Sequence, residues 1–266
     1  MVSNSPTEVP TDLKEIIDWM SRVPYSSGVR VICTQIFGIL RETVQSFPKM
    51  TVFYKVKSAM DTFMRKRELK GYSAYGEAAL AVKGYPDTEH GMCLDNTKHN
   101  DLHMGPSNGN DKCDVTNFES LEYEALNNII FHTFEGCDAL MKVLQKQGYV
   151  RVYVRSAEWD KGCKENQQTC AEVFLGFLPA LHASLSTLHD IISGDNASEL
   201  QVNDKDNTIG RFLQASGFEV YDQLKGDVDG QTLREAAAFL TPEYLQKLYY
   251  LCGFWKLYTK PYIYDY

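Results

Sequence analysis

The sequence lacks the motifs that mark the common enzyme classes. Its 266 residues hold no glycine-rich phosphate loop, no HExxH, no CxxC, and no nucleophile elbow between a strand and a helix. These absences remove the sequence signals for phosphoryl transfer, zinc-dependent proteolysis and serine hydrolysis. Carboxylates on distant helices can still meet in a folded chain, but we expect a protein that is not an enzyme and that holds no cofactor.

Long apolar runs are also missing. No basic and then apolar leader opens the chain, so we expect no cleavable secretory signal in it. The longest uncharged run, residues 173–189, is interrupted by Pro179, two histidines and three hydroxyl side chains. Because a membrane helix needs roughly 20 apolar residues, we predict no membrane span.

Basic residues are in deficit, since 27 Lys and Arg against 35 Asp and Glu give a formal net charge of -8. This balance argues against nucleic-acid binding, because neutralising phosphates needs a basic surface. The charge is uneven, however: residues 49–70 hold seven basic residues against Asp61 and Glu68, whereas residues 195–230 hold eight acids against three basic residues. We interpret both segments as solvated faces, with a polyanion-binding patch on the basic segment as the alternative.

Strand signals are scarce. Only residues 149–155, YVRVYVR, alternate with period two, and we interpret them as an extended connection, with a small hairpin as the alternative. Helical periodicity is far commoner and begins at residues 10–23, where apolar side chains recur at three- and four-residue steps. The predicted apolar face holds Leu13, Ile16, Ile17, Met20 and Val23, and the predicted polar face holds Lys14, Asp18, Ser21 and Arg22.

Capping signals mark where several helices begin. Thr11 or Asp12 can cap the first helix, with Glu15 completing a capping box when Asp12 is the cap. Two further capping boxes are Thr116 with Glu119 and Thr169 with Glu172, and Pro242 fits the first position of the last helix. The predicted helices span residues 10–23, 29–47, 51–69, 73–83, 116–148, 169–192, 208–216, 231–240 and 241–259, and Pro179 predicts a kink.

The same periodicity predicts which side chains are buried. The second helix buries Val29, Ile32, Cys33, Ile36, Leu40, Val44 and Phe47, and the third buries Phe53, Val56, Met60, Phe63 and Met64. The long helix from residue 116 buries Phe118, Leu121, Ala125, Ile129, Cys137, Leu140, Met141 and Leu144. Tyr244, Tyr249 and Trp255 fall on one helical stripe and are also predicted as core.

These segments predict an all-α fold, a multi-helix bundle with long irregular loops. We expect an N-terminal helical region over residues 1–83, a loop insertion over residues 84–115, and a C-terminal helical region over residues 116–266. The two helical regions are expected to pack together as one domain. Residues 84–115 are rich in Gly, Pro, Asn, Asp and His without any period, so they are either disordered or tied down by a disulfide.

Six of the seven cysteines fall into two groups. Cys33 and Cys252 lie within apolar helical patterns, where a reduced cysteine is a small core residue. Cys93 with Cys113, and Cys163 with Cys170, bracket polar loops and are the candidate disulfides. These pairs should be oxidised if the protein is outside the cell, whereas all seven cysteines should be thiols in the cytosol.

A metal site is the alternative use of these residues. Cys93, His99, His103 and Cys113 suggest zinc, but their spacings match no standard finger, so we interpret them as a disulfide and exposed side chains. His182 and His189 lie seven residues apart on one helix and are interpreted as surface or hydrogen-bonded core histidines. We predict no metal.

Three stretches together resemble the variant erythrocyte surface antigens of Babesia parasites. The most specific holds Leu13, Lys14, Glu15, Ile17, Asp18 and Trp19, followed by Arg22 and Val23, and is similar to the helix that opens the chain in that family. Residues 171–188 are similar to the family's apolar FLGxLPLxxxxL helix, and residues 208–224 to a short helix followed by glycine. The chain departs from the family at residues 24–27, which read PYSS where the family has GKDG, and members are usually longer and end in a membrane span. We therefore interpret it as an ectodomain fragment or a short relative.

The resemblance implies a function. It implies export to the infected erythrocyte surface, exposure on the extracellular face, antigenic variation for immune evasion, and adhesion to host endothelium through a host-cell receptor protein. A second antigen subunit is a further candidate partner, and the sequon at Asn196 is a candidate glycosylation site. The alternative is a cytosolic helical adaptor or an uncharacterised enzyme whose similarity is accidental.

Overall fold

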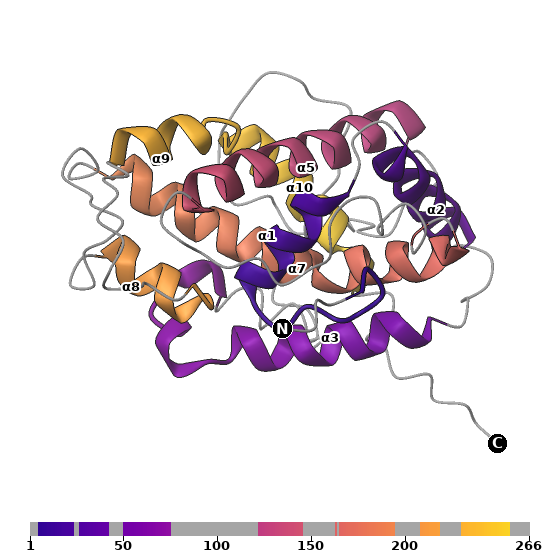
Figure 1. The fold of residues 1–266 in the computed structure, drawn as a ribbon, viewed down its shortest axis with the longest axis horizontal. Helices are drawn as coiled ribbons and strands as arrows, with labels where there is room; N and C mark the ends of the chain where they lie inside the picture. Colours follow the sequence, from indigo (N-terminus) through magenta and orange to yellow (C-terminus); the bar gives the residue numbers. More distant parts are fainter. Residues whose placement is uncertain are drawn as a thin grey trace, which may run out of the picture.

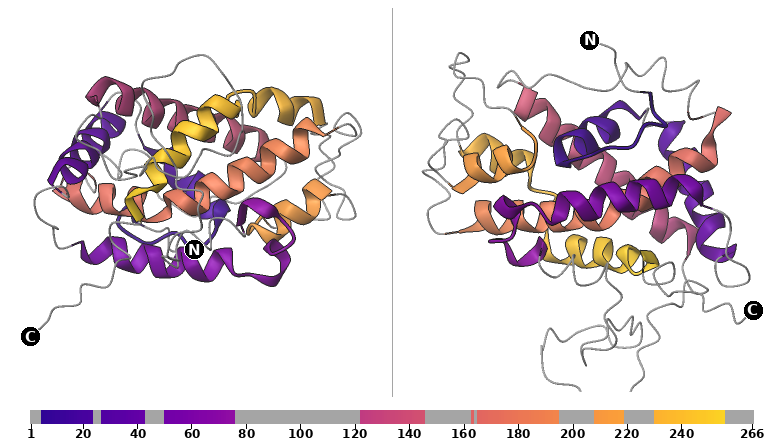
Figure 2. Two further views of the ribbon diagram at one scale, coloured as in Figure 1. Left: turned by 180° about the vertical axis from the view of Figure 1, so that it is seen from behind. Right: turned by 90° about the horizontal axis from the view of Figure 1, so that it is seen from below.

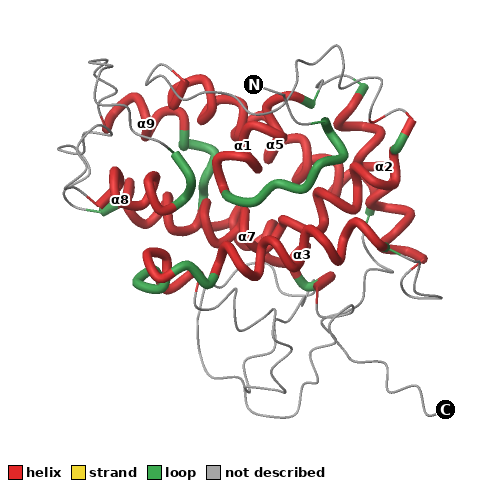
Figure 3. Tube along the Cα trace, turned by 60° about the horizontal axis from the view of Figure 1, so that its bottom comes forward, coloured by secondary structure: helices red, strands yellow, loops and turns green. Residues whose placement is uncertain are grey.

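The computed structural model describes residues 5–23, 27–42, 50–75, 122–145, 163, 165–194, 208–218 and 230–255. Within these ranges every regular element is a helix and none is a strand, so the predicted all-α class is confirmed (Figure 3). The α-helices are α1 (Leu13–Arg22), α2 (Gly28–Glu42), α3 (Thr51–Met64), α5 (Tyr123–Gln145), α7 (Gln167–Ser193), α8 (Thr208–Ala215), α9 (Gly230–Ala236) and α10 (Pro242–Cys252). A 3-10 turn, η1 (Arg67–Leu69), follows α3.

The helix α7 is the centre of the molecule. It contacts α1, α2, α3, α8, α9 and α10, which surround it in Figures 1 and 2. Because α7 is apolar on all sides, with Val173, Phe174, Phe177 and Leu181 fully buried, it can only be stable when other helices cover it. The helices before residue 83 therefore pack on the same core as those after residue 116, chiefly through α3 on α7 and α1 on α5.

The N-terminus of α3 is capped by a side chain from α7. Its own N-cap residue, Met50, offers no side-chain cap. The buried carboxylate of Glu172 instead accepts hydrogen bonds from the amides of Val52 and Phe53, at 2.9 and 3.2 Å. The predicted capping box of Thr169 with Glu172 is therefore wrong: α7 begins earlier, at Gln167, and Glu172 serves the neighbouring helix because α3 brings its free amides within reach.

Pro179 lies inside α7, and the helix continues past it to Ser193. Since proline has no amide hydrogen, the carbonyl of Leu175, four residues earlier, cannot accept its usual helical hydrogen bond. The indole N–H of Trp255 donates to this carbonyl at 2.9 Å in a buried setting. The chain just after α10 thus satisfies the backbone oxygen that the proline frees.

Most predicted core residues are buried, with one change of register. All predicted residues of α3 are buried, as are Leu13, Ile16, Ile17, Met20 and Val23 in and next to α1. In α5, however, Ala125 is exposed and Ile129 only half-buried, whereas Leu126 and Ile130 are fully buried. In the first half of α5 the predicted buried face is therefore wrong by one residue. Ala and Ile are compatible with either side of this helix, which contacts both α1 and α2, so their spacing alone does not decide which side is buried.

Gly176 allows a close helix crossing. A Cβ on Gly176 of α7 would lie 2.6 Å from Val56 Cβ and 3.3 Å from the carbonyl oxygen of Phe53, both in α3. At this point only a residue without a side chain lets the two helices approach as closely as they do. A Cβ on Gly136 of α5 would lie 2.4 Å from the ring of Phe239, whose far end can turn aside.

Several predictions lie outside the described residues. They concern residues 76–83 of the fourth predicted helix, the loop at 84–115 with Cys93 and Cys113, the capping box at Thr116, the strand-like residues 149–155, and Asn196.

Candidate functional site

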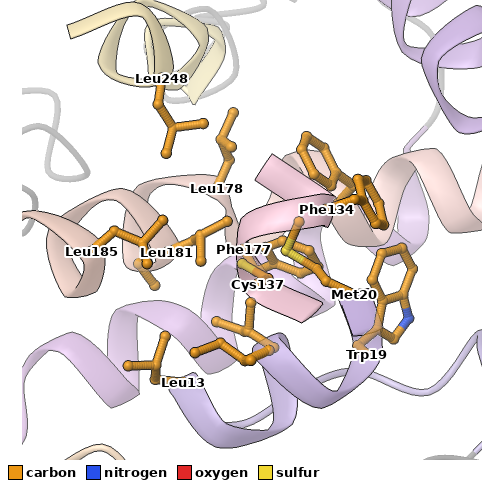
Figure 4. Close-up of a cluster of buried hydrophobic side chains, with 14 of the residues drawn as sticks. Leu13, Trp19, Met20, Phe134, Cys137, Phe177, Leu178, Leu181, Leu185 and Leu248 are labelled. Atoms are coloured by element: carbon orange, nitrogen blue, oxygen red, sulfur yellow. The ribbon is translucent and has the colours of Figure 1, made fainter. Parts of the chain in front are cut away.

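The signature helix α1 is the candidate site that the resemblance singles out, and most of its side chains point inward. Leu13, Ile17 and Trp19 are at most 1% exposed. Figure 4 shows Leu13 and Trp19 facing side chains of α5 and α7. These signature residues therefore form core contacts, and no ligand can reach them without opening the bundle.

Trp19 joins three parts of the chain. Its ring lies 6.1 Å from the ring of Phe134 in α5 and 5.4 Å from that of Phe177 in α7 (Figure 4). Its indole N–H donates to the carbonyl of Pro6 at 2.9 Å, which fastens the segment before α1. A buried tryptophan that is paired at its polar atom both anchors the helix and orients it.

Asp18 departs from the predicted pattern. The helical periodicity predicts Asp18 on the polar face of α1, but its side chain is fully buried. Arg22 forms an ion pair with it, with Arg22 Nε 3.6 Å from Asp18 Oδ1. A buried carboxylate is stable only with polar partners. The burial of Asp18 therefore depends on the packing around α1 and not on the periodicity of the helix itself.

The start of α1 meets the end of α8. Asp12 Oδ1 accepts from the amide of Glu15, which confirms Asp12 as the cap, while the Glu15 carboxylate reaches back to the amide of Thr11 and not to that of Asp12. The amide of Lys14 donates to the carbonyl of Ser216 at 3.2 Å. A free amide of one helix end thereby satisfies a free carbonyl of another, with the two helix dipoles running head to tail.

Gly217 makes this junction possible. Its φ is +96°, a left-handed conformation in which it ends α8, and the amide of Phe218 bonds back to the carbonyl of Leu213 at 3.0 Å. A Cβ at Gly217 would lie 2.3 Å from the Asp12 carboxylate. The backbone needs glycine here twice, for the turn and for the approach of α1.

Of the two candidate disulfides, one lies within the described residues. Cys163 and Cys170 are bonded to each other at the start of α7. Among the described cysteines, Cys33 and Cys137 are buried thiols and Cys252 is a half-buried one, which confirms the core role predicted for Cys33.

The two histidines of α7 lie in different environments. His182 is half-buried, its ring lies 5.1 Å from that of Tyr249, and burial lowers its pKa to about 4. His189 lies 3.3 Å from the carboxylate of Asp190. In the described part of the chain, no group of three His, Cys, Asp or Glu side chains is placed to hold a metal.

A shallow hollow of about 450 Å³ lies beside His189, between the end of α7 and α9. Arg234 and Leu240 also line it. No local sequence pattern indicates this hollow, because its walls come from the end of α7 and from residues in and after α9, and it depends on how these parts pack together.

The predicted basic segment forms the outer side of α3 and η1. Lys55, Arg67 and Lys70 are exposed, whereas Arg65 is held by Asp61, with Nε and Nη2 each 2.9 Å from a carboxylate oxygen. Lys57 is half-buried, with its ammonium 4.9 Å from the centre of the Trp255 ring. The exposed cations of this segment are thus concentrated toward η1.

One described helix, α7, is long and apolar enough to cross a membrane, yet 89% of its most apolar stretch is buried by other helices. A central core helix passes the same test, so this feature is weak evidence for a span.

Comparison with models of known protein families, with curated proteins and with solved structures finds no match. Fold and site together define an all-α protein built around one apolar helix, with a disulfide at that helix's start.

Proposed function

We propose that this chain is a parasite variant surface antigen, displayed on the infected erythrocyte, where it serves antigenic variation and adhesion to host endothelium. The resemblance to the Babesia antigens is the basis of this proposal. The observation that supports it is the packing of the three resembling stretches, which lie far apart in sequence: α1 contacts α7, α7 contacts α8, and the end of α8 bonds to the start of α1.

This packing gives the resemblance a physical meaning. Segments that bury one another must keep their shapes together, whereas exposed connections carry little packing and are free to vary. The proposal therefore assigns the scaffold to α1, α7 and α8, and the variable, receptor-facing surface to the loops at residues 84–115 and 195–207.

An extracellular location would keep Cys163 and Cys170, which lie at bonding distance, oxidised, because disulfides persist in oxidising compartments and are rare in the cytosol. On this proposal the partners are a host-cell receptor protein and a second antigen subunit, and the sequon at Asn196 is a candidate glycosylation site.

Surface labelling of intact infected erythrocytes tests the proposal. The expected result is a chain that is biotinylated by a membrane-impermeant reagent, that is lost on brief protease treatment of intact cells, and that has three free thiols when denatured without reduction. A chain found only inside the host cell or parasite, with seven free thiols, would contradict the proposal and favour a cytosolic adaptor or enzyme.

A further inference from the structure

A group of cations gathers where α1, η1 and α8 meet. We call this group, Lys14, Lys66, Arg67, Lys70 and Arg211, the basic corner. Four of the five are exposed and Lys14 is half-buried. The chain as a whole carries a formal charge of -8, so this corner is a local excess of the opposite sign.

The packing of η1 on α8 brings these cations together from distant parts of the sequence. Tyr72, just after η1, lays its ring 5.5 Å from that of Phe212 in α8, and the two elements are in contact. This places Arg211, next to Phe212, beside the turn that carries Arg67 and Lys70, and Figure 1 shows α8 directly above the end of α3.

Electrostatic effects on two neighbours agree with this placement. Burial raises the pKa of Tyr72, and the guanidinium of Arg211 is near enough to oppose that rise. Burial likewise raises the pKa of Asp12, against the lowering effect of the ammonium groups of Lys66 and Lys14. Lys14 and Lys66 therefore both lie near Asp12 at the start of α1.

The acids of this region are mostly engaged. Asp12 and Glu15 accept hydrogen bonds from backbone amides at the start of α1, and Glu68 is the exposed acid of η1. Among the described residues no carboxylate forms an ion pair with Arg67, Lys70 or Arg211, in contrast to Arg65 and Lys142, which Asp61 and Asp138 hold. The corner thus presents cations that are still available to an anion.

The form of the corner selects the kind of anion. Its side chains are exposed and none forms a buried pocket, so a single small anion gains little, whereas a polymer can contact several cations at once. Tyr72 is half-buried and Tyr75 buried, with both rings turned onto Phe212, so among the described residues the corner has no fully exposed ring on which nucleic-acid bases could stack. The large exposed apolar side chains of the described residues, Tyr54 and Phe131, are not part of the corner, so it offers no anchor of that kind to a lipid surface.

We propose that the basic corner binds a sulfated polysaccharide of the host cell surface, with sulfate groups contacting Arg67, Lys70 and Arg211. This identification of the polymer rests on the proposed function, since it needs an outward-facing location. It assigns adhesion to a fixed face of the helical scaffold in addition to the loops.

The test uses the 266-residue chain and a fluorescein-labelled heparin oligosaccharide, and binding is measured by fluorescence anisotropy between 50 and 200 mM NaCl. Over this range the affinity of a site with several ionic contacts falls roughly tenfold or more, because bound counterions are released. The variant R67Q/K70Q/R211Q removes three charges of the corner. The control R30Q/K142Q/K247Q removes three exposed charges on α2, α5 and α10, so both variants carry a net charge of -11 and repel a polyanion equally at long range.

The expected result is salt-dependent binding that the corner variant weakens about tenfold or more, with a salt slope lower by two to three, and that the control leaves within about twofold. Equal losses in both variants, no loss in the corner variant, or equal binding of desulfated heparin would overturn the proposal. Tighter binding to a single-stranded DNA oligonucleotide or to phosphatidylserine vesicles would replace the polysaccharide by that partner. These outcomes are independent of the surface-labelling result, so failure here leaves the proposed display on the erythrocyte standing, and a negative surface result leaves the measured binding in place.

Discussion

The crossing of α3 over α7 leads to the sharpest prediction about stability. In Gly176→Ala the added methyl group would lie 2.6 Å from Val56 Cβ and 2.8 Å from Val56 Cγ1, where carbon atoms normally stay about 3.5 to 4.0 Å apart. The nearest atoms include the carbonyl oxygen of Phe53, at 3.3 Å, which cannot rotate away. The two helices must therefore separate at the crossing by about 1 Å, and every contact around it is loosened.

The magnitude follows from two opposing effects. Overpacking of this kind costs about 1 to 3 kcal/mol, and the better helix propensity of alanine returns about 1 kcal/mol. We expect Gly176→Ala to lower the free energy of unfolding by up to about 2 kcal/mol. For a chain of this size that corresponds to a fall in Tm of up to about 8 °C.

Two other glycines serve as matched controls, measured alongside by urea denaturation and thermal melting under circular dichroism. A Cβ at Gly38 of α2 meets nothing within 4 Å, so Gly38→Ala should raise the stability by up to about 1 kcal/mol. Gly136→Ala meets only the far end of the Phe239 ring, which can swing aside, and should fall between the two. If Gly176→Ala is as stable as the wild type while Gly38→Ala is not stabilised, the close crossing described here is wrong.

Four further measurements test other contacts. Glu172→Ala should cost about 1 to 3 kcal/mol in urea denaturation, because it strips the cap from two α3 amides, and Glu172→Gln, which keeps an acceptor, should cost less. Trp255→Phe should cost about 1 to 2 kcal/mol, and distinctly less when combined with Pro179→Ala, whose restored amide can bond the same carbonyl; additive losses would refute that link. Burial holds the pKa of His182 near 4, below its unfolded value of about 6.5, so stability should be full above pH 6.5 and fall by at most about 3 kcal/mol as the pH drops to 4, with a shallower fall in His182→Gln. Cys170→Ser should lower the free energy of unfolding by about 2 to 3 kcal/mol, because it releases the loop that the disulfide closes. In reduced samples, where the wild type has no disulfide either, the same substitution should have no such effect.

The candidate site was only partly readable from the sequence. Periodicity predicts the burial of Leu13, Ile16 and Ile17, and the capping signal narrows the cap to Thr11 or Asp12, because these features depend on neighbours within one or two helical turns. The burial of Asp18 and the partner of Glu172 depend on side chains more than a hundred residues away or on the packing of other helices, and no local pattern reports them.

The basic corner illustrates the same division. The sequence shows a basic stretch near residue 66, but Arg211 stands within an acidic stretch and carries no signal of its own. The packing of Phe212 against Tyr72 and Tyr75 brings α8, and Arg211 with it, beside η1.

The sequence by itself determined most of the helices and narrowed the cap of the first to Thr11 or Asp12, since apolar spacing and hydrogen bonding along one segment decide these features. The tertiary structure alone decided that Glu172 caps α3, that Trp255 bonds the carbonyl freed by Pro179, and that three distant segments meet at one charged corner. The physical reason is that free backbone groups and surface charges take whichever partner packing brings within reach, and that choice is made only when the helices close around α7.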